Sequence, residues 1–217
     1  MIYCMSDIHG EIDRFMEMLK LIEFSDEDTL YIIGDVIDRG SGGVDILCYM
    51  AEHPNMILIR GNHEQMCLDT FRNNVCYNAK GVWRNNGGSV TYRDLVYHMD
   101  PADRNELLNY LADAPVSLDI EVDGRKFHLV HGWPSDDEDN QIWGRPMDGL
   151  GEIWDEDITP IIGHTPTIFL YPNIDNEPFH IHHSELGYIC IDCGCGNTTP
   201  RRRLACLCLN DMKEYYV

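Results

Sequence analysis

The sequence has few basic residues. Lysine and arginine together number 16, against 37 aspartate and glutamate residues, and the formal net charge is −21. Non-specific binding to nucleic acid depends on Lys and Arg side chains that contact phosphates. The charge balance therefore argues against a nucleic-acid-binding protein. It does not exclude a small phosphorylated substrate held by a few arginines.

Long hydrophobic runs are also absent. No apolar run approaches the ~20 residues that a bilayer-spanning helix needs. The chain starts "MIYCMSDIHG", with no basic segment before an apolar one. We therefore expect no membrane association and no signal peptide.

No G-x4-GK[ST] sequence occurs, so a P-loop kinase or ATPase is not supported.

The nine cysteines are odd in number and mostly scattered, which argues against a disulfide framework and favours a reducing cytoplasm. Five of them cluster near the end without the spacing of standard zinc knuckles, and we expect them to be buried thiols. They are Cys190, Cys193, Cys195, Cys206 and Cys208.

The first part of the chain repeats a strand, a polar loop and a helix. Strands are predicted at 2–5, 30–33 and 56–59, and helices at about 11–22, 43–52 and 64–72. Strands that alternate with helices predict a parallel sheet with right-handed crossovers. Ligands bind such sheets at the carboxyl ends of the strands, where the three polar loops fall.

The rest of the chain no longer alternates strands with helices. Residues 73–113 are predicted to be helical, as a cap or insertion interrupted by "WRNNGGS". From residue 116 onward the sequence predicts a hairpin with an Asp-Gly turn and then several short strands. With 217 residues and 44% hydrophobic content, we expect a single α/β domain over 1–217, with two sheets packed together and helices outside.

Polar side chains follow five of the predicted strands, in "SDIHG", "GDVIDRG", "RGNHE", "LVHG" and "IIGHTPT". Each motif alone is usually a turn or a strand end, but five in order make coincidence improbable. All offer oxygen or imidazole donors without sulfur, which suits Mn, Fe or Zn. Six ligands are enough for two metals if one carboxylate is shared. The candidates are Asp7, His9, Asp35, Asn62, His131 and His164.

These motifs resemble those of the phosphoprotein phosphatase (PPP) family within the calcineurin-like metallophosphoesterases. The small bacterial and lambda-phage-type serine/threonine protein phosphatases look most similar, and the related symmetrical diadenosine tetraphosphatases share the motifs. The resemblance covers residues 1 to about 200. It implies a four-layer sandwich of two mixed β-sheets flanked by helices, and two divalent metal ions, Mn by similarity to the small bacterial members, with Fe or Zn as alternatives.

The resemblance also implies a ligand set. The first metal takes Asp7, His9 and a bridging Asp35, and the second takes Asp35 with the remaining three donors, Asn62, His131 and His164.

Catalytic roles follow from the same resemblance. Arg39 looks like a phosphate clamp, because its planar fork suits two phosphoryl oxygens. Asp38 is expected to hold His63 protonated and oriented as a proton donor to the leaving oxygen. Arg145 in "WGRP" matches the second phosphate-binding arginine of the family. Arg60 and Asn62 in "RGNHE" are further substrate-binding candidates, although Arg60 could instead balance the charge of an acidic pocket.

The implied reaction is hydrolysis of phosphoserine or phosphothreonine, with phosphotyrosine as an option, by in-line attack of a metal-bridging hydroxide. The expected partner is a phosphorylated protein or a small phosphoester. One alternative is hydrolysis of dinucleoside polyphosphates or another nucleotide. A different class of alternative is an inactive relative that binds phosphorylated partners.

Three further stretches carry predictions. Trp133 in "HGWP" stands where the family usually has a small residue, and it is either an aromatic pocket wall or hairpin packing. The acidic segment "SDDEDN" at 135–140 is predicted to be a solvated turn near the entrance. The "HIHH" stretch at 180–183 is predicted to be an ordinary strand with exposed histidines.

Overall fold

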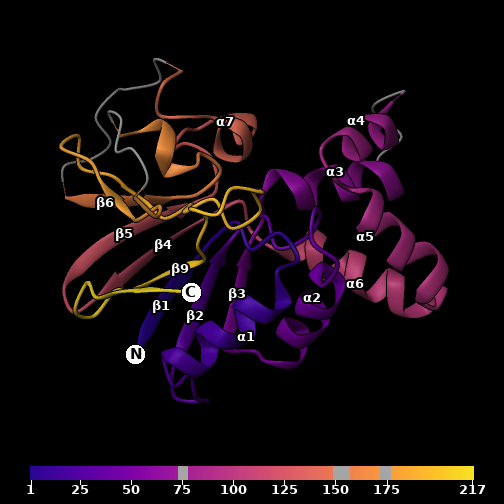
Figure 1. The fold of residues 1–217 in the computed structure, drawn as a ribbon, viewed down its shortest axis with the longest axis horizontal. Coiled ribbons are helices and arrows are strands. Elements are labelled where there is room, and N and C mark those ends of the chain that lie inside the picture. Colours follow the sequence, from indigo (N-terminus) through magenta and orange to yellow (C-terminus); the bar gives the residue numbers. More distant parts are fainter. Residues whose placement is uncertain (73–77, 149–156, 172–176) are drawn as a thin grey trace.

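The computed structural model describes residues 1–72, 78–148, 157–171 and 177–217. The predicted start of the helical insertion, at 73–77, lies outside these ranges. Two five-stranded sheets form the centre of the molecule, with helices packed outside them (Figure 1). The prediction of two mixed sheets flanked by helices is confirmed.

Sheet A has the order β10-β9-β1-β2-β3. Strands β1, β2 and β3 are parallel, as the repeated strand–helix pattern predicts, while β9 is antiparallel to both β1 and β10. The strands span Ile2–Met5 (β1), Thr29–Ile33 (β2), Met56–Ile59 (β3), Ala205–Cys208 (β9) and Glu214–Tyr216 (β10).

Sheet B has the order β4-β5-β6-β8-β7. The hairpin predicted around the Asp-Gly turn is the antiparallel pair β4–β5, and β6 then adds parallel to β5. The strands span Ser117–Val122 (β4), Arg125–Val130 (β5), Ile158–Ile162 (β6), His182–His183 (β7) and Ile189–Cys190 (β8).

The helices α1 (Ile12–Leu21), α2 (Gly43–Glu52) and α3 (Asn62–Phe71) follow the first three strands, as predicted. The middle of the chain forms α4 (Ala79–Asn85), α5 (Ser89–Arg93), a π-helical turn (Asp94–His98) and α6 (Pro101–Asp113). Figure 1 shows α3 to α6 together at one end of the molecule, away from sheet B.

The acidic segment 135–140 was predicted as a turn, but its second half starts a helix, α7 (Glu138–Trp143). The Asp137 side chain accepts a hydrogen bond from the Asp139 N–H at 3.2 Å and so caps the helix. Acidic residues in the first turn also interact favourably with the helix dipole. The prediction missed this helix because a run of acidic residues resembles a solvated loop.

Side-chain alternation explains how the two sheets pack. In β1, Tyr3 and Met5 belong to the core that sheet A shares with its helices, whereas Cys4 belongs to the core between the sheets. On the facing sheet, Phe127 and Leu129 of β5 occupy that inter-sheet core. A strand with both faces covered is buried throughout, as in the layered α/β arrangement.

The cysteines of the C-terminal cluster are buried and unpaired in this structure, as expected. No helix in the described part of the chain combines the length and the apolar character that crossing a membrane requires.

The buried carboxylate of Glu64 ties the loops after β2 and β3 together. Its Oε2 accepts from the Asp35 N–H at 2.8 Å and the Gly61 N–H at 3.0 Å, and its Oε1 accepts from the Val36 N–H at 2.9 Å. A weaker contact at 3.4 Å reaches the Ile37 N–H. One side chain in α3 thus fixes the loop that carries Asp35.

We expect Glu64→Gln to lower the free energy of unfolding by about 2–4 kcal/mol. The amide turns one acceptor into a donor that faces buried N–H groups and leaves them unsatisfied. Urea unfolding of both proteins measures the difference. The exposed Glu106→Gln in α6 is the matched control and should stay within ~0.5 kcal/mol of the parent. Equal stability of the two variants would refute this role of Glu64.

Candidate metal centre

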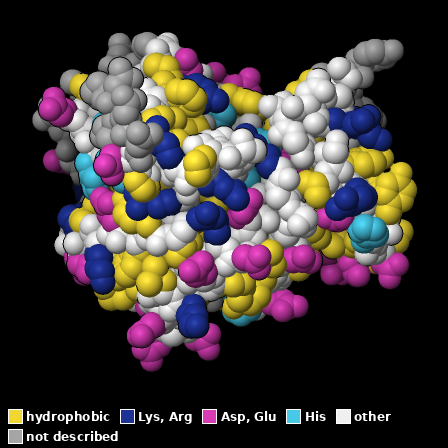
Figure 2. Space-filling view, in the orientation of Figure 1, with side chains coloured by type: hydrophobic (Ala, Val, Ile, Leu, Met, Phe, Trp, Pro, Cys, Tyr) yellow, Lys and Arg dark blue, Asp and Glu magenta, His cyan; other side chains and the backbone are white. Residues whose placement is uncertain are grey.

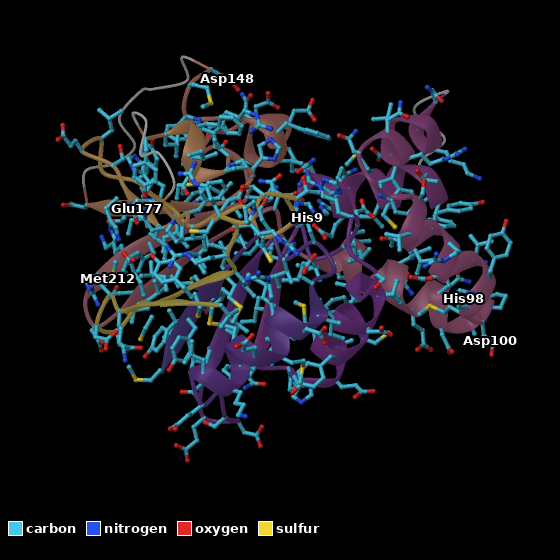
Figure 3. The ribbon with its side chains drawn as sticks, in the orientation of Figure 1. His9, His98, Asp100, Asp148, Glu177 and Met212 are labelled. Atoms are coloured by element: carbon cyan, nitrogen blue, oxygen red, sulfur yellow. The ribbon has the colours of Figure 1, made fainter. Side chains whose placement is uncertain are left out.

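The predicted ligands come from the carboxyl ends of strands in both sheets. Asp7 and His9 follow β1, Asp35 follows β2, and Asn62 opens α3 just after β3; His131 follows β5 and His164 follows β6. All six side chains are buried. Five of them line one cavity of about 210 Å³, and His131 is not among the lining residues. Figure 3 places His9 between the strands and the α3–α6 helices.

Two groups of donors share Asp35. His9, Asp35 and His63 form one group, and Asp35, His131 and His164 form the other, with the ligand atoms of each group within 4.8 Å of one another. The Asp35 Oδ2 lies 3.6 Å from His9 Nε2, and its Oδ1 lies 3.2 Å from His131 Nε2. Asp35 is therefore shared by two groups that could each hold a metal ion.

The first group differs from the predicted set in one member. His63, and not Asp7, joins His9 and Asp35 in the close cluster. Asp7 lines the same cavity, and its Oδ2 accepts from the His164 N–H at 3.0 Å. Asp7 thus contacts a member of the second group through the His164 backbone and belongs to neither close cluster.

The His9 and His131 imidazoles are oriented with Nε2 toward Asp35. His9 Nδ1 faces the Ile37 carbonyl at 3.1 Å and His131 Nδ1 faces the Ile33 carbonyl at 2.9 Å. A ring whose Nδ1–H donates to a carbonyl presents Nε2 as an acceptor, which is how protein histidines are usually held for a metal.

The environment of Asn62 fits a cation. Its Oδ1 lies 3.0 Å from His131 Nε2 and 3.0 Å from His164 Nδ1, beside the Asp35 carboxylate. In this orientation the amide oxygen also faces the Asp35 carboxylate oxygens, and a divalent ion can satisfy these acceptors together. Without an ion, the rotated amide can donate to the same three side chains. Carboxylate, amide and imidazole donors without sulfur suit a borderline or hard divalent metal.

Burial and buried charge set the protonation of the site. Burial lowers the pKa of His9 to about 3 and that of His164 to about 3, so both rings are neutral and able to ligate a metal at pH 7. Burial opposes charge on His131 as well, but the Asp35 carboxylate outweighs it and raises the pKa to about 10. Burial and repulsion from Asp7 hold the pKa of Asp192 well above its usual range. Asp192, which lines the same cavity, therefore favours its protonated, uncharged form.

Left-handed backbone conformations gather at this centre. Nine non-glycine residues in the described ranges have positive φ, and six of them are site residues. Such conformations are costly for side chains and persist where the surroundings enforce them. The six are Asp7, His9, Asp35, Asp38, Arg39 and His164.

The predicted proton donor has its predicted partner. His63 Nδ1 lies 2.6 Å from Asp38 Oδ2, and both side chains are buried. Burial opposes protonation of His63, but Asp35 and Asp38 outweigh it and raise the pKa of the imidazole. The ring can therefore hold a proton on the wall of the cavity.

Two of the three predicted arginines reach the cavity. Arg39 lines it, and its Nη2 lies 3.5 Å from His63 Nε2. Arg145 also lines it, and its Nη1 donates to the His164 carbonyl at 3.2 Å. Arg60 is not brought into the cavity: its Nη2 donates to the Glu138 carboxylate at 3.2 Å on the surface.

The aromatic residue at the cavity is not the one singled out in the sequence. Trp133 is buried, packs edge-on against Tyr188 and belongs to a small core on the outer face of sheet B, so the hairpin-packing alternative holds. Trp143, at the end of α7, and Phe169 line the cavity instead and are 40% and 68% exposed. No motif marks either residue, because their placement depends on α7 and on the turn after β6.

Sequence reasoning also missed the partners of Asp38. Trp83 and Thr91 both donate to its carboxylate. The two residues flank the "NNGGS" segment, which the sequence marks only as an interruption in a helical region.

One spacing in the sequence, Cys195-x5-Arg201, matches that of thiol-based phosphatases. The structure excludes this chemistry. Cys195 is part of a hydrophobic core, and burial raises the pKa of its thiol to about 12, so no thiolate nucleophile forms at neutral pH. Arg201 Nε donates to the Glu177 carbonyl.

Comparison with known proteins gives a consistent result. Serine/threonine-protein phosphatase 2 of Salmonella typhimurium is 30% identical over 185 residues, which are 80% of this chain and 80% of the relative. A symmetrical bis(5'-nucleosyl)-tetraphosphatase of Salmonella paratyphi B is 32% identical over 126 residues, which cover 57% of this chain and 39% of that protein.

Solved structures agree on the fold. A metallophosphoesterase from Sphaerobacter thermophilus has a TM-score of 0.60 at 19% identity, covering 100% of this chain and 87% of the other. The cold-active protein-tyrosine phosphatase of a Shewanella species has a TM-score of 0.55 at 16% identity, covering 99% of this chain and 79% of the other. The calcineurin-like phosphoesterase profile matches residues 1–209. The chain therefore belongs to the calcineurin-like phosphoesterase family.

Proposed function

We propose that the protein is a cytoplasmic two-metal phosphomonoesterase that hydrolyses phosphoserine and phosphothreonine in proteins, with phosphotyrosine as a further substrate. One observation carries the proposal: two donor groups share Asp35 and open onto the same cavity as the His63–Asp38 pair. Metal, proton donor and phosphate-binding arginines are then available to one bound phosphoryl group.

In this proposal His9, Asp35 and Asp7 hold one cation, and Asp35, Asn62, His131 and His164 hold the other. When bound, divalent cations, Mn before Fe or Zn, supply positive charge for the phosphoryl oxygens and an acidified water as nucleophile.

The chain's own residues perform the remaining steps. Arg39 lines the cavity next to His63, and Arg145 lines it next to His164. Both orient the phosphoryl group with their planar guanidinium forks. His63 gives its proton to the leaving oxygen, because its Nδ1 is held by Asp38 and its Nε2 faces the Arg39 and Asp35 side of the cavity.

A single phosphate on a peptide suits the charge of the surface. The acidic residues Asp136 and Asp137 directly precede α7. The last residue of this helix, Trp143, lines the cavity. On the face in Figure 2, acidic side chains gather along the lower edge and basic ones near the middle, where Figure 3 places His9. The basic side chains suit a bound phosphate, whereas the acidic residues that precede α7 disfavour a polyphosphate more than a neutral or basic peptide.

Hydrolysis of dinucleoside polyphosphates is the second candidate, and one observation favours it. Trp143 and Phe169 are exposed aromatic side chains on the cavity wall, beside Arg145. Aromatic side chains stack on nucleobases, typically for about 1–3 kcal/mol per base.

We expect His63→Asn to lower kcat by about 10²–10⁴-fold for phenyl phosphate, because the leaving phenoxide then departs without a proton. With 2,4-dinitrophenyl phosphate the loss should be far smaller, since that leaving group needs little protonation. Steady-state kinetics of both esters, with bound metal measured in parallel, check this. An equal loss for both esters would assign His63 to metal support instead.

For substrate choice we expect kcat/KM for a phosphothreonine peptide to exceed that for diadenosine tetraphosphate under one metal condition. A preference of more than ~100-fold for the dinucleotide, worth about 2.7 kcal/mol, would establish the second candidate. Trp143→Ala separates the two further, because it should weaken only a substrate with a stacked base. Tyr97→Ala, at an aromatic residue exposed on the π-helical turn away from the cavity lining, is the matched control.

A further inference from the structure

Asp38 is a fully buried carboxylate with three side-chain donors around it. Its Oδ2 accepts from Trp83 Nε1 at 2.6 Å and faces His63 Nδ1 at 2.6 Å. Its Oδ1 accepts from Thr91 Oγ1 at 2.6 Å. The distances are short, as expected for hydrogen bonds to an ionised group. Two of the three donors come from the helical segment α4–α5.

The Thr91 hydroxyl has its orientation fixed from both sides. It donates to the Asp38 carboxylate and accepts from the Asp38 backbone N–H at 3.1 Å. Asp38 has a φ of 74°, a left-handed conformation that costs energy for a residue with a side chain. A single hydroxyl therefore secures both the strained backbone and the carboxylate of Asp38.

Trp83 is held just as firmly. It is fully buried and lies edge-on to Phe71 at 6.1 Å and to Tyr92 at 6.3 Å between ring centroids. Gly88 packs so closely on the indole that a Cβ there would lie 2.4 Å from the ring. The indole N–H has no freedom to turn away from Asp38.

The same segment also contacts the neighbouring phosphate-binding candidate. The Gly87 carbonyl, in the turn between α4 and α5, accepts from the Arg39 N–H at 3.3 Å, and Asn86 lines the cavity. Helices α4 and α5 thus reach the loop after β2 at two adjacent residues, Asp38 and Arg39.

We propose that Trp83 and Thr91 are positioning residues that hold Asp38 so that the His63 imidazole presents its proton to the leaving oxygen. This rests on the proposed function, in which His63 is the proton donor. A carboxylate bound only to His63 could rotate about its Cβ–Cγ bond and carry the ring with it. With both oxygens occupied by fixed donors, the carboxylate plane and the imidazole plane are set together. Through Trp83 and Thr91 alone, helices α4 and α5 then orient the proton donor and do more than cap the fold.

Two conservative variants test this. Trp83→Phe keeps a buried ring but removes the indole N–H, and Thr91→Val keeps the branched shape but removes the hydroxyl. Tyr92→Phe and Thr70→Val are matched controls, because each removes a hydroxyl from a nearby helix without touching Asp38; the Thr70 hydroxyl donates to the Met66 carbonyl. Each protein is assayed with phenyl phosphate and with 2,4-dinitrophenyl phosphate.

We expect each test variant to lose about 10-fold in kcat for phenyl phosphate, the size of one charge-assisted hydrogen bond. For 2,4-dinitrophenyl phosphate the loss should be less than about threefold, and KM and bound metal should not change. The double variant should lose more than either single one. Neither control should lose activity with either ester.

A second measurement does not depend on turnover. The proton between His63 Nδ1 and Asp38 should give a downfield imidazole resonance in the NMR spectrum, identified by its loss in His63→Asn. We expect this resonance to broaden or move upfield in Trp83→Phe and Thr91→Val and to be unchanged in both controls.

The results that contradict the proposal are distinct. An equal loss for both esters, an unchanged resonance, or a variant that loses its fold or its metal would assign Trp83 and Thr91 to structure alone. If the parent protein hydrolyses neither ester, the proposed function fails, and the resonance still reports whether the two residues orient the imidazole.

Discussion

The charge of Asp35 is the constraint on which the site depends. Its carboxylate is buried, in a left-handed backbone conformation, with His9, His63 and His131 around it. Burial alone would raise its pKa, but the surrounding imidazoles hold the pKa well below the usual range, so the charge persists. A buried charge is stable only when it is paired or coordinated. The arrangement of strand ends from both sheets around Asp35 answers that requirement.

Three buried carboxylates near the cavity offset the free-energy cost of burying a charge with different partners. Glu64 accepts from backbone N–H groups and thereby fixes the loops. Asp38 accepts from side chains and thereby orients a single imidazole. Asp35 faces imidazole nitrogens and the Asn62 amide, and it belongs to both groups of potential metal ligands. The donors around each carboxylate therefore distinguish a structural role for Glu64, an orienting role for Asp38 and a metal-binding role for Asp35.

The strand-end loops could be predicted from the sequence because polar side chains directly follow apolar strands, and the parallel order brings those ends together. The partners of Asp38 could not, because Trp83 and Thr91 lie 45 and 53 residues away and carry no motif. The aromatic residue Trp143 at the cavity could not be predicted either, because it is placed there by a helix that starts in an acidic run and resembles a loop. Arg60 matches a motif, but its guanidinium pairs with Glu138 and does not line the cavity.

Metal stoichiometry tests the central claim most directly. Protein stripped with a chelator is titrated with Mn²⁺, and the bound ions are counted by elemental analysis after desalting. The account predicts two ions per chain for the parent protein, one each for His9→Ala and His164→Ala, and less than one for Asp35→Asn, which should also be inactive. A single ion in the parent protein, or two retained by Asp35→Asn, would contradict a centre built on a shared Asp35.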